Sequence, residues 1–255
     1  MGNEGHKVIA LIAEHYLDPA VRFKVATLLE ADTDPLTAHD IASEVTWADK
    51  YRDADRDTTK IRYQATRQWH FVDIELSQPD LAAACFGHPP LLAGVPASKG
   101  PPEACVVDKN DQFTAELGDP ATGASEQLLA LKILLHFVGD LHQPLHASDD
   151  RDAGGNKKLV AGDGLRPGNL HHYWDVEFVE GLGTDPRQVA ASLIGRISDP
   201  QRQEWSSGTG RLGNGSFRSR STRRLWTASS TRRSRHICAS ARVHEAGCEG
   251  CRASA

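Results

Sequence analysis

The segment from Glu126 to His142 constrains the fold more than any other part of the chain. Its apolar side chains leave almost no polar face, so the sequence predicts a helix that is buried all round. Yet Lys132, His136 and Asp140 recur every four residues, which places them on one stripe of that helix. A buried histidine or aspartate destabilises the fold unless it finds a partner. A metal ion is the simplest partner, so the segment predicts a metal site inside the core.

The residues after the helix extend this site. His136 and Asp140 lie one helical turn apart, where both side chains can bind one ion. Pro144 ends the helix, so His146 can turn back towards the same cavity. The sequence therefore predicts His146 as a further ligand.

Other histidines and aspartates add candidate ligands. His171 and Asp175 repeat the spacing of the first pair, and Asp49, His70 and His6 lie upstream. An isolated His-x-x-x-Asp pair is more often a hydrogen-bonded pair than a metal site. Taken together, a set of His and Asp ligands without Cys is typical of catalytic zinc.

Up to about Asp199 the chain shows helical apolar patterns separated by loops, without a run of alternating β-branched residues. We therefore predict an all-α fold, a compact helical bundle with the metal cleft on one face. The predicted helices span residues 8–17, 19–29, 37–52, 126–142 and 185–197, and the predicted long loops span residues 80–111 and 149–169.

Charge divides the chain into two parts. The net charge is −5, but residues 211–252 carry ten Arg and two Glu, so the rest has a balance of −13. A chain this acidic repels nucleic acid unless bound metal supplies positive charge. After Trp205 the sequence is rich in Ser, Arg and Gly and lacks periodicity, as in a disordered basic tail. We prefer a reading-frame error, and divide the chain into a domain of residues 1–205 and an aberrant tail of residues 206–255.

The cysteines and the first residues of the chain give information about the cellular compartment of the protein. Cys85 and Cys105 flank a loop rich in Pro and Gly, and they either close it as a disulfide in an oxidising compartment or remain two free buried thiols. No segment is apolar and long enough to span a membrane. The first residues carry no signal peptide, which fits either a cytoplasmic protein or a mature form whose leader has been removed.

Several short strings occur in a fixed order along the chain. They are G-H near the start, W-A-D-x-x-R, W-H-F-V-D, H-F-V-G-D-x-H-Q-P-L-H, G-G-N and N-L-H-x-x-W-D. In this order they resemble the zinc-dependent single-strand nucleases, which comprise fungal nucleases and plant bifunctional nucleases and are distantly related to zinc phospholipase C. The resemblance covers roughly Gly2 to Trp205, and the string from His136 to His146 is very specific to the family.

The resemblance implies a cleft that holds three zinc ions. One ion would be bound by Asp49, His70, His136 and Asp140, a second by His146, His171 and Asp175, and a third by Asp140, His6 and the amino group and carbonyl oxygen of Met1. His142 matches the motif but is not expected to be a ligand. The family begins with Trp where this chain has Met1. We therefore expect a leader that ends before residue 1, and a secreted or periplasmic protein.

The resemblance also implies the reaction, which is the endonucleolytic hydrolysis of single-stranded DNA and RNA to products with 5′-phosphates. Activity as a 3′-nucleotidase is left open, and we expect a monomer that does not insert into a membrane. The implied catalytic residues are Asp49, Arg52 and Asp140. The implied substrate-binding residues are Phe71, which would stack on an unpaired base, Asp73, which would accept a hydrogen bond from its edge, and Asn156 near the base.

Two other functions compete with this one. The first is a phospholipase C-like lipid phosphodiesterase that uses the same zinc cage, and the second is a non-catalytic zinc-binding helical domain. Asp175 stands where the lipid enzyme typically has Glu, which favours the nuclease. A ligand set that leaves coordination positions open argues against a purely structural site.

Overall fold

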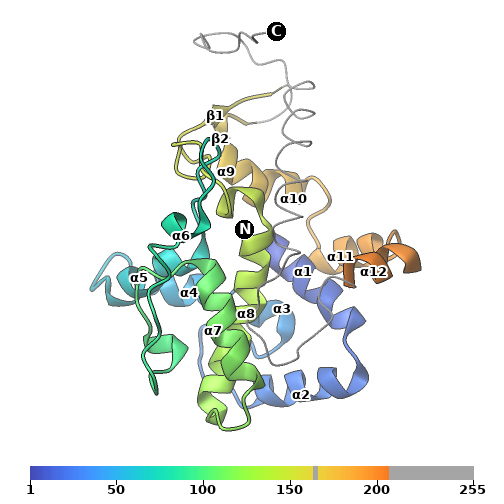
Figure 1. The fold of residues 1–255 in the computed structure, drawn as a ribbon. Helices are drawn as coiled ribbons and strands as arrows, with labels where there is room; N and C mark the ends of the chain where they lie inside the picture. The colour runs from blue at the N-terminus through green and yellow to red at the C-terminus, as the bar shows by residue number, and fades with distance from the viewer. Residues whose placement is uncertain (163–165, 207–255) are drawn as a thin grey trace.

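The computed structural model describes residues 1–162 and 166–206, and most of these residues are helical (Figure 1). The predicted all-α class is therefore confirmed, while most of the predicted tail, residues 207–255, lies outside the described part of the chain. The α-helices are α1 Asn3–Tyr16, α2 Pro19–Glu30, α3 Ile41–Glu44, α4 Trp47–Asp53, α5 Ile61–Thr66, α6 Leu81–Ala84, α7 Val106–Gly118, α8 Ala124–His142, α9 Leu170–His172, α10 Phe178–Glu180, α11 Pro186–Ile194 and α12 Asp199–Ser206. Shorter turns are η1 Arg67–His70, η2 Ala97–Lys99, η3 Pro144–His146 and the π-helical η4 Tyr173–Glu177.

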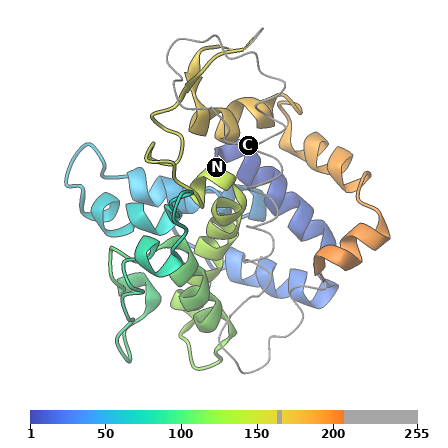
Figure 2. The same cartoon turned by 45° about the horizontal axis from the view of Figure 1, so that its top comes forward.

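Helix α8 lies in the middle of the molecule in both ribbon views (Figure 1, Figure 2). It packs against α7 along one side and against α1, α2, α3 and α4 elsewhere. Lys132, His136 and Asp140 are all buried, as the apolar pattern around them predicts. The polar stripe of the central helix is therefore inside the protein and must be satisfied by other buried groups.

Two apolar clusters hold α8 in place. The larger one joins α4, η1, α7 and α8 and contains the fully buried rings of Trp69, Phe113 and Phe137. The smaller one joins α1, α2, α3 and α8 around Val45 and Leu131. Together they fix the rotation of α8 about its axis, and so the direction in which its polar stripe points.

The predicted helix over residues 37–52 is wrong, because the chain forms two short helices instead. The side chain of Asp40 accepts hydrogen bonds from the backbone N–H groups of Ala42 and Ser43, which begins α3. The β-branched pair Val45 and Thr46 separates α3 from α4. The break leaves the carbonyl of Val45 free to face the central helix.

The two predicted long loops contain more structure than expected. Residues 80–111 include α6, η2 and the start of α7, so the predicted loop is too long. Residues 149–169 include the antiparallel pair β1 (Leu159–Val160) and β2 (Gly168–Asn169), in which Leu159 faces Asn169. Pairs this short carry no apolar alternation, so the sequence pattern does not reveal them.

The disulfide between Cys85 and Cys105 is present, with the two Cα atoms 5.0 Å apart. This settles the two readings of these cysteines in favour of the bond. It joins the end of α6 to the residue that precedes α7, and the next N–H, that of Val106, donates to the carbonyl of Phe71. The bond therefore ties down the segment that follows η1.

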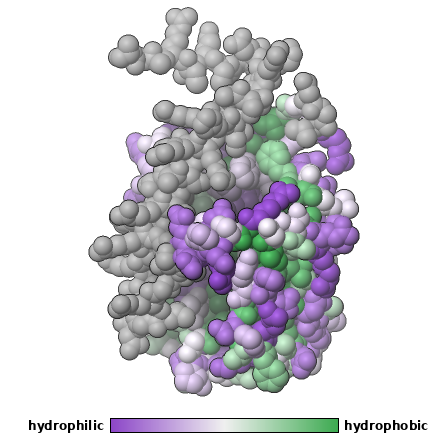
Figure 3. Space-filling model, turned by 90° about the vertical axis from the view of Figure 1, so that its right-hand side faces the viewer, coloured by the Kyte–Doolittle hydropathy of each residue, from purple (hydrophilic) through white to green (hydrophobic). Residues whose placement is uncertain are grey.

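The surface carries apolar side chains as well as polar ones. On the face shown in Figure 3, hydrophobic residues reach the surface between hydrophilic ones. Among the exposed apolar side chains, Phe23 of α2 is 73% exposed and Trp205 of α12 is 60% exposed. Among the described helices, none combines the length and apolar character needed to cross a membrane.

Candidate metal centre

Asp140 of α8 stands at the centre of a group of nitrogen atoms. Its Oδ1 lies 2.8 Å from the amino group of Met1 and 3.1 Å from Nε2 of His6, and its Oδ2 lies 3.1 Å from both Nδ1 of His70 and Nε2 of His136. Burial alone would raise the pKa of the Asp140 carboxyl, but the surrounding cations, His136 foremost, hold it well below its usual range. The carboxylate is thus ionised and fully enclosed.

Asp49 of α4 completes this group and is its most exposed member, with a side chain that is 25% exposed. Its Oδ1 is 3.5 Å from Nδ1 of His70 and 3.4 Å from Nε2 of His136. Burial acts to lower the pKa of His136, yet Asp140 and Asp49 outweigh it and raise this pKa to about 10. We call His6, Asp49, His70, His136 and Asp140 the buried cluster.

A second group lies beside the first and is more open to solvent. Nε2 of His171 is 3.3 Å from Oδ2 of Asp175, and Nε2 of His146 is 3.7 Å from Oδ1 of Asp175. Asp175 lies in the π-helical turn η4, and Gln143 donates a hydrogen bond to it over 2.8 Å. We call His146, His171 and Asp175 the outer cluster. Its side chains are 10% to 20% exposed, whereas those of the buried cluster other than Asp49 are at most 4% exposed.

The amino group of Met1 joins the two clusters. It lies 2.8 Å from Nε2 of His146 and 3.3 Å from Oδ1 of Asp175, besides its contact with Asp140. Burial acts to lower the pKa of this amino group, but Asp140 and Asp175 raise it overall. The first residue is therefore placed where the resemblance expected a ligand.

Three of the imidazoles each donate a hydrogen bond from one ring nitrogen to a backbone carbonyl. In metal sites this kind of hydrogen bond fixes the tautomer of a histidine and leaves its other nitrogen free for the ion. The Nδ1 atoms donate over 2.7 Å from His136 to Val45, over 2.9 Å from His146 to His70, and over 2.7 Å from His171 to Gly154. Sequence reasoning missed these partners, because any residue type can supply a carbonyl.

Buried ring nitrogens that lack a hydrogen-bond partner indicate whether these residues fit a metal ion. Nε2 of His136 is buried, lies between the carboxylates of Asp49 and Asp140, and makes no hydrogen bond; both ring nitrogens of His6 are also without one. Buried polar atoms are seldom left unpaired in native proteins. The imidazole and carboxylate groups of both clusters converge closely enough to bind metal ions. The donor set fits zinc.

Two of the residues that were expected to bind substrate follow His70 closely in the chain. Phe71 and Asp73 are half-buried on the segment that follows η1. Burial first and Asp149 second raise the pKa of Asp73 to about 6, while the imidazoles of His146 and His171 act in the opposite direction.

Two other residues from the sequence analysis have local partners. Asn156 is exposed and its side chain donates to the carbonyl of Ala153. Lys132 makes an ion pair with Asp32 and lies 3.6 Å from Glu44, so this member of the polar stripe is satisfied by carboxylates. The spacing rule that grouped it with His136 did not reveal these partners, which are far away in sequence.

Arg52 projects from α4 beside the buried cluster. Its Nη1 donates to Asp49 over 2.6 Å, while Nε and Nη2 form a two-point contact with Asp53 over 2.9 and 2.7 Å. A bidentate pair of this kind fixes the plane of the guanidinium. Asp53 is a residue that sequence reasoning did not single out.

Comparison with known proteins agrees with this arrangement. The family model described as S1/P1 Nuclease matches residues 1–246. The chain is 32% identical to Nuclease S1 of Aspergillus oryzae, over 70% of this chain and 54% of that protein. It is 31% identical to Endonuclease 2 of Arabidopsis thaliana, over 80% of this chain and 65% of that protein. It is 29% identical to Nuclease P1 of Penicillium citrinum, over 68% of this chain and 56% of that protein.

The aligned part of the chain therefore spans between about half and two thirds of these relatives. The family model covers far more than half of the chain, including every residue of both clusters. By this match the chain belongs to the S1/P1 nuclease family.

Proposed function

We propose that residues 1–205 form the catalytic domain of a zinc-dependent endonuclease that hydrolyses phosphodiester bonds in single-stranded DNA and RNA. The observation that carries the proposal is the position of Asp140, whose two carboxylate oxygens face different nitrogen ligands inside one buried site. A carboxylate shared in this way can hold neighbouring ions at a short separation. Such groups of ions are typical of enzymes that cleave phosphate esters.

The proposed zinc ligands follow the two clusters. Asp49, His70, His136 and Asp140 would hold one ion, His146, His171 and Asp175 a second, and Asp140, His6 and the backbone of Met1 a third. Zinc supplies the positive charge and the water activation that phosphodiester hydrolysis needs. The charge also explains how an acidic chain binds a polyanion.

Arg52, together with Asp49 and Asp140, forms the proposed catalytic group. The guanidinium is held against Asp49 and Asp53 at the edge of the buried cluster, so it can neutralise a phosphate oxygen without first giving up side-chain freedom. Asp49 and Asp140 would keep the ions at fixed positions.

Phe71, Asp73 and Asn156 would bind the base. A half-buried phenyl ring can stack on a base only when that base is unpaired, which would restrict the enzyme to single strands. Asp73 would accept a hydrogen bond from the edge of the base. Products with 5′-phosphates, activity on RNA and 3′-nucleotidase activity belong to the same proposal.

The disulfide supports a secreted or periplasmic location, because such bonds persist in oxidising compartments. We propose that the protein acts there as a monomer.

Elemental analysis and an activity assay on one preparation test the function. We expect about three zinc ions per chain, with cleavage of single-stranded DNA that is lost on chelation and restored by zinc. Phosphatidylcholine is assayed alongside. Hydrolysis of the lipid in place of DNA would support the lipid phosphodiesterase, and bound zinc without turnover on either substrate would support a structural zinc domain. Arg52→Ala should lower the rate of DNA cleavage about 100-fold with zinc content unchanged.

A further inference from the structure

Basic residues gather on α4, on α5 and on the turn between these two helices. Residues 50–67 contain six Lys or Arg and three Asp, a balance of +3, whereas the chain outside residues 211–252 has a balance of −13. Three of these cations, which we call the basic turn, are exposed and lie beyond the end of α4: Arg56, Lys60 and Arg62. In an acidic protein, a local excess of exposed cations is a candidate surface for a polyanion.

Asp53 joins the basic turn to Arg52, the proposed catalytic arginine. Its carboxylate forms the two-point contact with the guanidinium of Arg52, and its Oδ1 lies 3.9 Å from Nη1 of Arg56. Arg52 also contacts Asp49 of the buried cluster and is 21% exposed, while Arg56 is 56% exposed. Two guanidinium groups in contact with one carboxylate thus lead from the proposed zinc cleft towards solvent.

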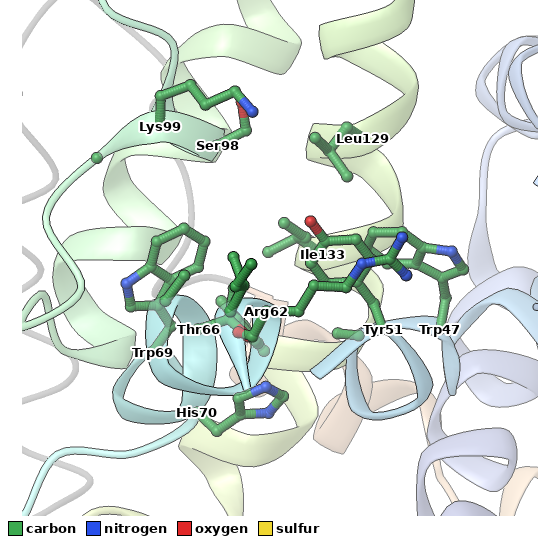
Figure 4. A pocket seen from close by; sticks show the side chains of 15 residues that line it. Trp47, Tyr51, Arg62, Thr66, Trp69, His70, Ser98, Lys99, Leu129 and Ile133 are labelled. Atoms are coloured by element: carbon green, nitrogen blue, oxygen red, sulfur yellow. The ribbon is translucent and has the colours of Figure 1, made fainter. Parts of the chain in front are cut away.

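Each arginine of the basic turn lies over a tyrosine ring. The guanidinium carbon of Arg56 is 5.2 Å from the ring centroid of Tyr63, and that of Arg62 is 4.7 Å from the ring centroid of Tyr51. Figure 4 shows Arg62 of α5 beside Tyr51 of α4, at a cavity that both residues line. A guanidinium that lies on an aromatic face keeps the N–H groups at its edge for a phosphate.

Asp55 fixes the backbone that carries these cations. Its carboxylate accepts hydrogen bonds from the N–H groups of Arg62 and Tyr63 over 2.9 and 3.1 Å, and from the hydroxyl of Thr59 over 2.7 Å. Its carbonyl accepts from the N–H of Lys60 over 2.9 Å. The turn is therefore held against the first turn of α5, so little backbone entropy is lost when an anion binds there.

The carboxylates of this segment leave the cations available. Asp53 is occupied by the two neighbouring arginines, Asp55 is occupied by backbone N–H groups, and Asp57 is exposed. Among the described residues, no carboxylate forms an ion pair with Lys60 or Arg62. The charges of these two side chains therefore remain free to meet an anion from solution.

We propose that the basic turn binds the backbone phosphates of a single-stranded polynucleotide beyond the phosphate that is cleaved. The inference rests on the proposed nuclease function, in which Arg52 neutralises the scissile phosphate. A long strand held there can place further phosphates at Arg56, Lys60 and Arg62, whereas a dinucleotide has no further phosphate. The surface therefore favours long strands over short ones. It does so for any sequence, because phosphate contacts carry no base information.

Cleavage kinetics of the zinc-loaded enzyme on a long thymidine strand and on a thymidine dinucleotide test the surface. With Ala at all three positions of the basic turn, KM for the long strand should rise at least about tenfold with kcat unchanged. Both constants for the dinucleotide should stay the same. A matched control that removes three exposed cations elsewhere should change nothing; it combines Lys24→Ala, Arg187→Ala and Arg196→Ala. An equal loss on both substrates, or an unchanged KM for the long strand, overturns the proposal.

The dependence on salt separates phosphate contacts from a structural effect. Loss of three phosphate contacts should lower the slope of log KM against log salt concentration by about 2 for the long strand. Lys60→Ala with Arg62→Ala, which keeps the contact between Arg56 and Asp53, should lower it by about 1.4. Arg56→Lys with Arg62→Lys should keep most of the slope, because the charge is retained. If these Lys variants lose as much slope as Ala variants, the arginines support the turn and do not bind phosphate, and the proposal is wrong.

A binding measurement distinguishes this proposal from the proposed nuclease function. The probe is a fluorescein-labelled long thymidine strand with phosphorothioate linkages, which resist hydrolysis, and its fluorescence anisotropy reports binding to the zinc-loaded protein. The wild type and the matched control should bind the probe at least about tenfold more tightly than the triple variant of the basic turn. Equal affinities contradict the proposal. Tighter binding by the wild type without cleavage of the ordinary strand would leave the surface standing while the nuclease function fails.

Discussion

The buried cluster and the outer cluster use the same two residue types in different surroundings. The buried cluster stands on α1, α4, η1 and α8, where packed helices fix each side chain. The outer cluster stands on η3, α9 and η4, where short turns and one glycine-rich loop do this work. The difference teaches that neighbouring groups of His and Asp side chains can be held in place by packed helices in one case and by short turns in the other.

The surroundings also set the electrostatics. Around Asp140 the imidazoles of His6, His70 and His136 are almost completely enclosed, so attraction between ion and ligand is weakly screened. Asp175 is 20% exposed, and its Oδ1 accepts a hydrogen bond from Gln143. We therefore expect the buried cluster to hold its ions more tightly and to release them more slowly.

The largest effect should come from removing the shared carboxylate. Asp140→Asn keeps the shape but removes the charge that faces Met1, His6, His70 and His136. We expect loss of more than one zinc ion and at least about a 1000-fold fall in DNA cleavage, because several kcal/mol of charge stabilisation disappear. Elemental analysis and the cleavage rate measure both.

Asp175→Asn is the matched change in the outer cluster. It should cost one ion and a smaller part of the rate, whereas His142→Ala, an exposed residue on α8 outside both clusters, should cost neither. Equal zinc losses in the two aspartate variants would remove the distinction between the clusters.

The next effect concerns the loop behind the outer cluster. Gly154 has a φ of +59°, and a Cβ there would overlap the carbonyl oxygen of Leu145. Gly154→Ala should displace the carbonyl that accepts from His171, and lower the zinc affinity of the outer cluster about 10- to 100-fold. Zinc competition with a chelating dye should show that the tighter sites are unchanged.

Gly94 provides the control for backbone strain. Its φ is +76°, yet a Cβ there meets nothing within 4 Å. Gly94→Ala should therefore lower stability slightly and leave every zinc affinity unchanged. If both glycine variants lose zinc alike, strain rather than the position of the carbonyl is responsible.

The burial of His136 and Asp140 could be predicted from the sequence because its physical basis is local. A helix without a polar face cannot carry His136 and Asp140 unless they are satisfied, and that conflict is visible in one segment. The break between α3 and α4 was missed, because the hydrogen bond from His136 to the carbonyl of Val45 joins residues far apart in sequence. A cavity beside His70 was missed for a similar reason, because its walls come from five separate elements, α4, α5, η1, η2 and α8.

The smallest expected effect concerns the apolar surroundings of Lys109, next to Trp69. Lys109 is fully buried against Trp69, donates to the carbonyl of Ala97 over 2.7 Å, and forms no ion pair within the described residues. Burial lowers its pKa from 10.5 to about 8, against the opposing effect of Glu116. Between these two values the unfolded chain holds a proton that the folded protein lacks.

The free energy of unfolding should therefore rise as the pH increases from about 8 to 10.5, by at most about 3 kcal/mol. Chemical unfolding of the zinc-loaded protein at several pH values measures the slope. Lys109→Met should abolish the rise, since no titrating group is left, whereas Lys24→Met on the exposed face of α2 should keep it. A rise that survives in Lys109→Met would mean that another group titrates, and that the region behind Trp69 is more polar than its burial implies.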